Sequence, residues 1–276
     1  MTGERCVGFG RVIDTDCSIA GTIVGKADRD DAAIIVRQQP AAAMAAPPLW
    51  SGNAAALDFA PPGVARYRCT GRSIDIIPAP DPPAGMIDAL LLATALPAVL
   101  WLAGSFVLHA AAVVPAGEDG ALAIGGPSSS GKSRLAAALL ARGADLLADD
   151  SIALTCDPGG VTGTGLPGGY HLGAPGSDER PFHPVPPERA RRSARLAAIV
   201  ILDAHTAAPT PLRGVDAVAA LLAHRHRPSV PRHAGLEPRS LRDAACLARM
   251  VPVYRWPRDE ADGLLDEHVR AGIMQD

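Results

Sequence analysis

The stretch GGPSSSGKSRLAAALLARGADLLADD, which runs from Gly125 to Asp150, decides the fold. Residues 126–133 match the pattern G-x-x-x-x-G-K-[ST], in which glycines let the backbone bend until successive N–H groups face one phosphate group. The apolar residues 121–126 predict a strand before this loop, and residues 132–142 predict a helix that a following glycine ends. A strand, a phosphate loop and a helix in this order predict a nucleotide site in an α/β fold.

The lysine content of the chain strengthens the prediction of a phosphate loop. Only two of the 26 basic residues are lysines, Lys26 and Lys132, and one of them occupies the position where the pattern needs it. The Lys132 ammonium would reach the β- and γ-phosphates of ATP, and the Ser133 hydroxyl would bind Mg²⁺. The alternative is a serine-rich turn that contains GKS by chance. The candidate nucleotide-binding residues are Gly126, Ser128, Ser129, Ser130, Gly131, Lys132, Ser133 and Arg134.

Two adjacent acids end the next predicted strand, residues 144–150. A strand beside the phosphate loop ends near the γ-phosphate, so acids there can bind a metal ion or accept a proton. We expect Asp149 to be the base for a substrate hydroxyl and Asp150 to be a ligand of Mg²⁺, directly or through water. The alternative is an ordinary Asp-Asp-Ser turn at a strand end.

Around this stretch, apolar segments bounded by turn residues predict the strands and helices of the second half of the chain. Residues 106–114 and 151–156 read as strands, with a tight turn over 116–120. Further strands are expected at 195–204 and 251–256. Helices are expected at 241–250 and as an amphipathic tail from Asp259.

The first half predicts a smaller β-rich domain. Strands are expected at 17–25, 32–37 and 73–78, and four prolines in residues 78–85 indicate a linker. We therefore predict an N-terminal domain over 1–84, with a role in substrate recognition, and a kinase-like domain over 85–276. No Asp, Glu, Lys or Arg occurs from Ala89 to Val114, but Pro97 and a Gly-Ser pair interrupt that stretch. It predicts a buried helix over 85–103 and then a strand, rather than a membrane span.

Composition excludes several classes of protein. The chain has 276 residues with a net charge of −3, 48% hydrophobic and 20% charged residues, which excludes wholesale disorder and gives no reason to expect nucleic-acid binding. Its five cysteines are scattered and odd in number, so they predict neither a disulfide framework nor a structural zinc site. The N-terminus lacks the apolar segment of a signal peptide, so we expect a cytoplasmic protein.

Five features in order resemble the kinase domain of the bacterial HPr kinase/phosphorylase family. The similarity covers about residues 108–151 well, the rest of the second half loosely, and the first 100 residues hardly at all. The features are Leu108-His109-Ala110-Ala111, the loop GGPSSSGKS, the helix Leu135–Leu140, the stop Arg142-Gly143-Ala144, and Leu147-Ala148-Asp149-Asp150.

This resemblance implies an ATP- and Mg²⁺-dependent serine kinase whose fold is related to that of phosphoenolpyruvate carboxykinase. It implies that Asp149 acts on the substrate serine hydroxyl and that His109 lies against that acid, holding the carboxylate and tuning its pKa. The residues alone favour a different interpretation of His109, as a core histidine on an apolar strand. The resemblance also implies assembly with further copies of the chain.

Departures from the family pattern refine this expectation. Ser129 stands where bifunctional members usually carry glycine, and no Pro-Gly-Arg-Asn run occurs near the C-terminus. We therefore expect a kinase without phosphorylase activity. The C-terminal Pro252-Val253-Tyr254-Arg255 resembles divergent relatives that phosphorylate ribosomally made precursor peptides, including lasso peptides. The alternatives are a kinase of an HPr-type phosphocarrier and a nucleotide-binding regulatory module without transfer activity.

Two polar regions leave their roles open. The Gly- and Pro-rich residues 157–187, with Tyr170, His171, Arg180 and His183, predict either a lid over the nucleotide or a solvated insertion. Two basic clusters could stabilise a transferred phosphoryl group, grip a peptide carboxylate, or form a solvated face. They comprise Arg189, Arg191, Arg192 and Arg195, and Arg225, Arg227 and Arg232 with His224, His226 and His233; these histidines have no metal-site spacing.

Overall fold

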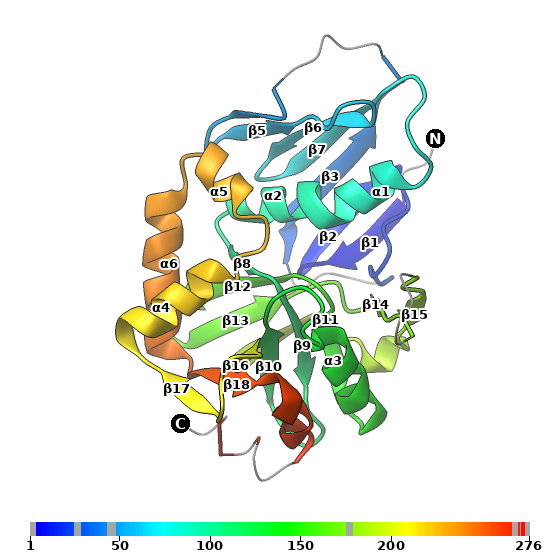
Figure 1. Cartoon of the computed structure of the whole chain (residues 1–276). Helices are drawn as coiled ribbons and strands as arrows, with labels where there is room; N and C mark the ends of the chain where they lie inside the picture. The colour runs from blue at the N-terminus through cyan, green and yellow to red at the C-terminus, as the bar shows by residue number, and fades with distance from the viewer. Residues whose placement is uncertain are drawn as a thin grey trace.

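The described part of the chain forms two large β-sheets joined by one run of helix (Figure 1). The computed structural model describes residues 4–24, 29–42, 48–174 and 179–266, together with residues 270, 272 and 273. The described strands of the first sheet come from residues 4–78, and those of the second come from residues 106–257. This arrangement agrees with the prediction of a β-rich segment ahead of an α/β segment.

The first sheet has the strand order β1-β2-β3-β7-β6-β5-β4. Fully buried positions alternate with more accessible ones along β7, as expected for a sheet with one well-covered face. The strands are β1 (Glu4–Gly8), β2 (Arg11–Thr15), β3 (Arg29–Gln38), β4 (Trp50–Gly52), β5 (Ala56–Phe59), β6 (Ala65–Thr70) and β7 (Ser73–Pro78).

Two of the three strands predicted here are confirmed. Residues 32–37 and 73–78 lie within β3 and β7. The strand predicted over 17–25 is wrong: up to residue 24 the segment is a loop with a single isolated bridge, between Ile23 and Val7, and residue 25 lies outside the described residues. The Thr15 hydroxyl accepts a hydrogen bond from the Cys17 N–H at 2.9 Å, and this side-chain turn competes with the extended backbone.

A continuous helical run connects the sheets. It consists of α1 (Met86–Leu90), the π-helical turn η1 (Leu91–Ala95) and α2 (Leu96–Leu102). The helix predicted over 85–103 is confirmed, although α1 itself has no fully buried residue. Pro97 has no N–H to donate to the preceding turn of this run, and the wider π-helical turn η1 lies just before it. Among the described residues, no helix is long and apolar enough to cross a membrane.

The second sheet has the order β11-β9-β10-β16-β13-β12-β8, with β18 paired to β16 and β17 paired to β18. Its strands are β8 (Phe106–Leu108), β9 (Ala110–Val114), β10 (Gly120–Gly125), β11 (Asp145–Ala148), β12 (Ile152–Asp157), β13 (Gly160–Thr164), β16 (Ser193–Asp203), β17 (Thr210–Leu212) and β18 (Val253–Pro257). The helices around it are α3 (Lys132–Ala141), α4 (Gly214–Ala223), α5 (Ser229–His233) and α6 (Glu237–Met250).

The strand and the helix predicted on either side of the phosphate loop are confirmed, but the single strand predicted over 106–114 is divided at His109 into β8 and β9, which pair with different strands. β9 and β10 form an antiparallel pair, β10 leads into the loop, and α3 ends before Gly143, whose φ is +97°. β16 runs parallel to β10 and pairs Ile201 with Gly125. The carboxyl ends of these two strands therefore meet at the edge that carries the phosphate loop.

The segment 157–187 differs from the loop that its composition predicts. It contains β13, the hairpin of β14 (Gly169–His171) and β15 (Phe182–Pro184), and the start of the short helix η2 (Pro187–Arg189). Gly163 in β13 is needed for packing, because a Cβ there would lie 2.7 Å from the Ile152 Cδ1 atom. After β18 the predicted tail begins as the 3₁₀ helix η3 (Arg258–Leu265), and much of the remainder lies outside the described residues.

One hydrophobic cluster includes residues of both sheets. It contains Ile34 and Ile74 from the first sheet, Trp101 from α2, and Phe106 and Leu154 from the second sheet. The helical run makes contacts with strands of both sheets. The division at residue 84 therefore stays a prediction, because the two segments share a core.

Candidate active site

The predicted phosphate cradle is the loop between β10 and α3. Gly126 has φ +143° and Gly131 has φ +100°, values that favour glycine. A Cβ on Gly126 would lie 2.7 Å from the Ser130 Oγ atom and 2.9 Å from the Leu202 carbonyl oxygen. Ser129 has φ +61°, so this serine adopts the left-handed conformation that favours glycine. Both glycines of the G-x-x-x-x-G-K-[ST] pattern therefore stand at positions whose backbone angles favour glycine.

Lys132 is the first residue of α3, and its side chain is buried. Its Nζ atom donates hydrogen bonds to the carbonyl oxygens of Gly126 at 2.9 Å and Pro127 at 2.8 Å. Burial lowers the pKa of this lysine, while the nearby Asp150 carboxylate raises it. The ammonium therefore lies inside the cradle, at the positive end of the helix, where an anion would be held.

The two acids after β11 point to different partners. Asp149 is largely buried, and its Oδ2 atom accepts a hydrogen bond from the His171 N–H at 2.8 Å. Asp150 is exposed, and its Oδ1 atom lies 3.4 Å from the His109 Nδ1 atom. The two carboxylates therefore take up separate positions, as the sequence predicts for two separate roles.

Burial makes Asp149 a stronger base than an ordinary aspartate. Desolvation raises the pKa of its carboxyl group, while the His171 N–H and the Ser133 hydroxyl oppose that rise. The influence of Ser133 places its hydroxyl beside Asp149. The pairing of Ser133 with Asp150 around Mg²⁺ stays a prediction, since the described contacts of Asp150 are to histidines.

His109 occupies the break between β8 and β9, and its predicted partner is wrong. Its Nδ1 atom lies 3.0 Å from the Asp150 carbonyl oxygen, instead of against Asp149. The reason is geometric: β12 pairs Ile152 with Leu108, which brings the exposed Asp150 past the histidine while Asp149 turns inward. His109 is thus neither the core histidine of the simplest interpretation nor a direct partner of the base.

His226 joins this site, although the sequence places it only in a basic cluster whose histidines have no metal-site spacing. Its Nδ1 atom lies 3.3 Å from the His109 Nδ1 atom and 3.8 Å from the Asp150 Oδ2 atom. The ligand atoms of His109, Asp150 and His226 all lie within 4.8 Å of one another. The alternating His-Arg run over 224–227 was the available signal, but 117 positions separate His226 from His109.

Two buried polar atoms in the cradle have no hydrogen-bond partner among the described residues. They are the Ser130 Oγ atom and the Asp149 Oδ1 atom. A buried polar group without a partner is costly, so such groups usually meet a ligand or water. Both atoms lie where the predicted nucleotide phosphates and substrate hydroxyl would be, and the residues present therefore fit those groups.

Arg134, the last of the predicted nucleotide-binding residues, is exposed on the first turn of α3.

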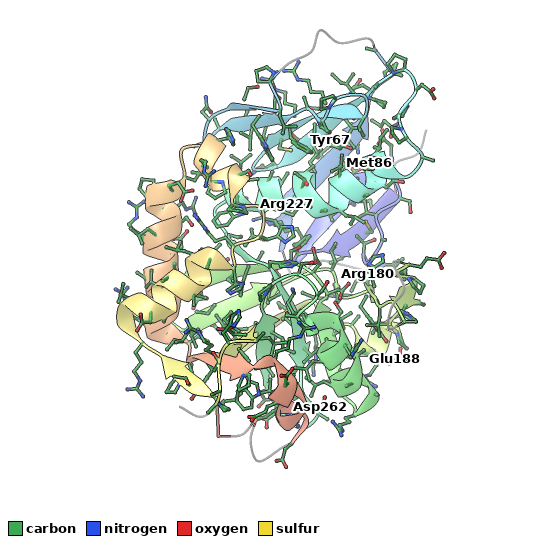
Figure 2. All side chains as sticks on the ribbon, in the orientation of Figure 1. Tyr67, Met86, Arg180, Glu188, Arg227 and Asp262 are labelled. Carbon is green, nitrogen blue, oxygen red and sulfur yellow. The ribbon has the colours of Figure 1, made fainter. Side chains whose placement is uncertain are left out.

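The β14–β15 hairpin supplies further groups to the site. The His171 N–H binds Asp149, and the positive charge of Arg180 lowers the pKa of Lys132. Arg180 lies on the hairpin side of the molecule, whereas Arg227 lies near α2 (Figure 2). The position of the hairpin favours a covering role for this segment over a solvated insertion.

Most arginines of the two basic clusters have structural partners. Arg189 and Arg191 both pair with Asp145, at 3.0 and 2.8 Å. Arg195 pairs with Asp157, and Arg225 pairs with Glu237. Of the two clusters, Arg227 is the residue whose charge acts on the site histidines, because it lowers the pKa of both His109 and His226.

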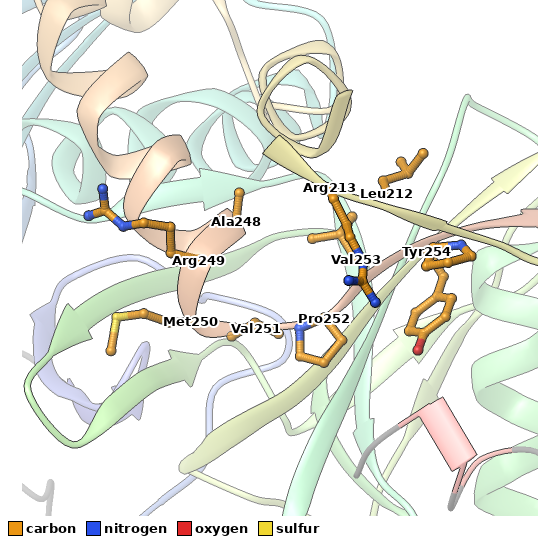
Figure 3. Close-up of a pocket in the computed structure, with 10 residues that line it drawn as sticks. Leu212, Arg213, Ala248, Arg249, Met250, Val251, Pro252, Val253 and Tyr254 are labelled. Atoms are coloured by element: carbon orange, nitrogen blue, oxygen red, sulfur yellow. The ribbon is translucent and has the colours of Figure 1, made fainter. Parts of the chain in front are cut away.

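A separate cavity of about 290 Å³ lies between β17, the end of α6 and the start of β18 (Figure 3). Its lining includes Arg213, Met250 and Tyr254 but none of the phosphate-loop residues or the two acids. The cavity is therefore distinct from the candidate active site.

Proteins similar to this chain are found among solved structures. No protein-family model and no curated protein sequence matches the chain. Among solved structures, the Hpr(Ser) kinase/phosphatase from Coxiella burnetii is similar, with a TM-score of 0.40 and 18% sequence identity. That match covers 61% of this chain and 97% of the other.

Proposed function

We propose that the protein is an ATP- and Mg²⁺-dependent kinase that phosphorylates a serine hydroxyl on a peptide or small protein. The observation that carries this proposal is Asp149: a buried carboxylate of raised pKa, with one unpartnered oxygen, beside a phosphate loop. A carboxylate in that position can accept the proton of a hydroxyl as the hydroxyl attacks the γ-phosphate.

The chain's own residues divide the work of phosphoryl transfer. The loop N–H groups and the start of α3 hold the phosphates, and Lys132 turns from its present carbonyl partners to the β- and γ-phosphates. Mg²⁺, held by Ser133 and an acid of the pair, would supply neutralising charge on those phosphates. The β14–β15 hairpin excludes water, which favours transfer over hydrolysis.

The substrate class rests on the sequence resemblance. Ser129 and the missing Pro-Gly-Arg-Asn run support a kinase without phosphorylase activity. The Pro252–Arg255 segment supports a ribosomally made precursor peptide, of the lasso-peptide type, as the substrate. We infer a serine near the C-terminal end of that peptide.

Phosphoryl transfer can be tested with γ-labelled ATP and two sets of acceptors, synthetic peptides with a C-terminal serine and an HPr-type phosphocarrier. We expect label on a peptide serine, with mass spectrometry locating the added phosphate. Label on the phosphocarrier alone would mean that the substrate is a carrier protein and not a peptide. Binding of a fluorescent ATP analogue without label on either acceptor would contradict the kinase and favour a nucleotide-binding regulatory module.

A further inference from the structure

Two chain segments far apart in sequence bring the rings of His109 and His226 together, with centroids 5.3 Å apart and an interplanar angle of 54°. The segment 224–227 runs along β8: the His226 N–H donates to the Val107 carbonyl at 2.8 Å, and the His109 N–H donates to the His224 carbonyl at 2.9 Å. Leu108 and Arg225 form an isolated antiparallel bridge between these bonds. Backbone hydrogen bonds therefore fix the two histidines as neighbours.

The separations among the three side chains suit one metal ion. The two Nδ1 atoms are 3.3 Å apart, and they lie 3.4 and 3.8 Å from the nearer carboxylate oxygens of Asp150. Zinc–nitrogen bonds of about 2.0–2.1 Å in a tetrahedron put neighbouring ligand atoms about 3.3 Å apart. An ion can therefore bind all three groups with small side-chain adjustments.

His226 is already oriented as a ligand. Its Nε2 atom donates to the Ala93 carbonyl at 3.0 Å, which leaves the lone pair of the neutral ring on Nδ1, facing the other two groups. The Trp101 Nε1 atom donates to the His226 carbonyl at 3.0 Å and holds its backbone. A backbone carbonyl on the far ring nitrogen is the usual support for a metal-binding histidine.

A metal-binding histidine is neutral. Burial lowers the pKa of His109 and of His226. The positive charges of Lys132 and Arg227 are nearby, and the two carboxylates, Asp149 and Asp150, offset them. His109 would bind through Nδ1 with its proton on Nε2, giving up its present hydrogen bond to the Asp150 carbonyl.

We propose that His109, Asp150 and His226 form a binding site for a divalent ion of the zinc class, next to the phosphate loop. Two imidazole nitrogens and one carboxylate suit such an ion, whereas Mg²⁺ prefers oxygen ligands alone. The ion is distinct from the Mg²⁺ that accompanies the nucleotide, and its binding does not depend on the proposed kinase activity. Three protein ligands leave a further coordination position open.

The site can be tested on the metal-stripped full chain with Co²⁺ alone, in the absence of nucleotide. Co²⁺ reports its coordination by visible absorption, and we expect one equivalent to give the bands of a four- or five-coordinate site. Zn²⁺ should displace Co²⁺ and abolish these bands, while excess Mg²⁺ should not.

Matched variants locate the binding. His226→Gln should weaken Co²⁺ binding by more than about tenfold, because a lost ligand costs more than a lost supporting group. His224→Gln, two positions away, is the control and should bind as the wild type does. Asp150→Asn changes an exposed side chain, so it tests the site even where the His226 variant folds poorly. Equal Co²⁺ spectra and affinities in the wild type and Asp150→Asn would overturn the proposal.

Discussion

Gly126 is the residue on which the shape of the phosphate loop depends most directly. Its φ of +143° and the 2.9 Å approach of the Leu202 carbonyl leave no room for a side chain. Gly126→Ala should therefore lower the free energy of unfolding by about 1–3 kcal/mol, and weaken binding of a fluorescent ATP analogue.

Gly117 provides a matched control for that substitution. It also has a positive φ, +80°, but a Cβ there would meet nothing within 4 Å. Gly117→Ala should cost about 1 kcal/mol or less and leave nucleotide binding unchanged. Urea unfolding of both variants measures the difference. Equal losses would mean that contact with Leu202 is unimportant and that only the backbone angle matters.

The pH dependence of phosphoryl transfer should report the raised pKa of Asp149. A base works only when deprotonated, so activity is lost as the pH falls through its pKa in the folded protein. Because burial raises that pKa above its ordinary value of 3.8, the acid limb of kcat/KM should lie above pH 3.8. Initial rates between pH 4 and pH 8 test this, with far-UV circular dichroism confirming that the chain stays folded. If the Asp149→Asn variant keeps the same acid limb, that limb reports the titration of another group.

At the scale of elements, side-chain hydrogen bonds from β6 connect the first sheet to the helical run. The buried Tyr67 hydroxyl of β6 donates to the Ile87 carbonyl of α1 at 2.9 Å. Tyr67→Phe should lower the free energy of unfolding by about 0.5–1.5 kcal/mol. Thermal unfolding followed by circular dichroism measures the loss, and Tyr170→Phe on the hairpin is a partly exposed control. An unchanged stability would mean that water replaces the bond without cost.

The buried phenol of Tyr67 should also affect how the stability of the fold changes in alkali. Burial raises the pKa of its phenol well above the ordinary value of 10. The unfolded chain then loses the proton first and binds fewer protons than the folded chain, so stability falls as the pH rises above 10. Tyr67→Phe should make this fall less steep than in the wild type. If the difference in free energy of unfolding between the wild type and Tyr67→Phe stays constant from pH 8 to pH 11, this prediction is wrong.

The elements around the phosphate loop could be predicted because local patterns fix them. Residues 110–114 and 196–202 are continuous apolar runs, as expected for buried strands, and Gly143 ends α3 through its positive φ. β13 could not be predicted, because its glycines have low strand propensity and the packing of Gly163 against Ile152 is a tertiary contact. The short strands β1 and β2 could not be predicted either, because they depend on pairing with neighbouring strands and not on their own length or composition.

At the scale of the whole molecule, the candidate site depends on contacts that no local pattern contains. Asp149 and Lys132 follow from a motif, whereas His226 reaches His109 only because segment 224–227 lies along β8. The same tertiary pairing explains why the expected contact between His109 and Asp149 is replaced by one with Asp150. The sequence thus predicts the phosphate-binding half of the site better than its histidine half.

The shared core predicts that the two sheets unfold together. Trp50 lies in the first sheet, Trp101 in α2 and Trp256 in the second sheet, so fluorescence can follow each part of the molecule. Variants that retain only Trp50 or only Trp256 should give the same urea midpoint, because residues of both sheets form one cluster. Two separate midpoints would support an independent domain over 1–84.

The most direct test of the account is phosphoryl transfer by Asp149→Asn, measured with γ-labelled ATP and peptides that end in serine. The wild type should label a peptide, and the variant should transfer at least about 100-fold more slowly, since a missing general base typically costs that much. Binding of a fluorescent ATP analogue should be unchanged, and Asp157→Asn, an exposed acid of β12, should transfer as the wild type does. Transfer by Asp149→Asn at the wild-type rate would contradict the assignment of Asp149 as the base.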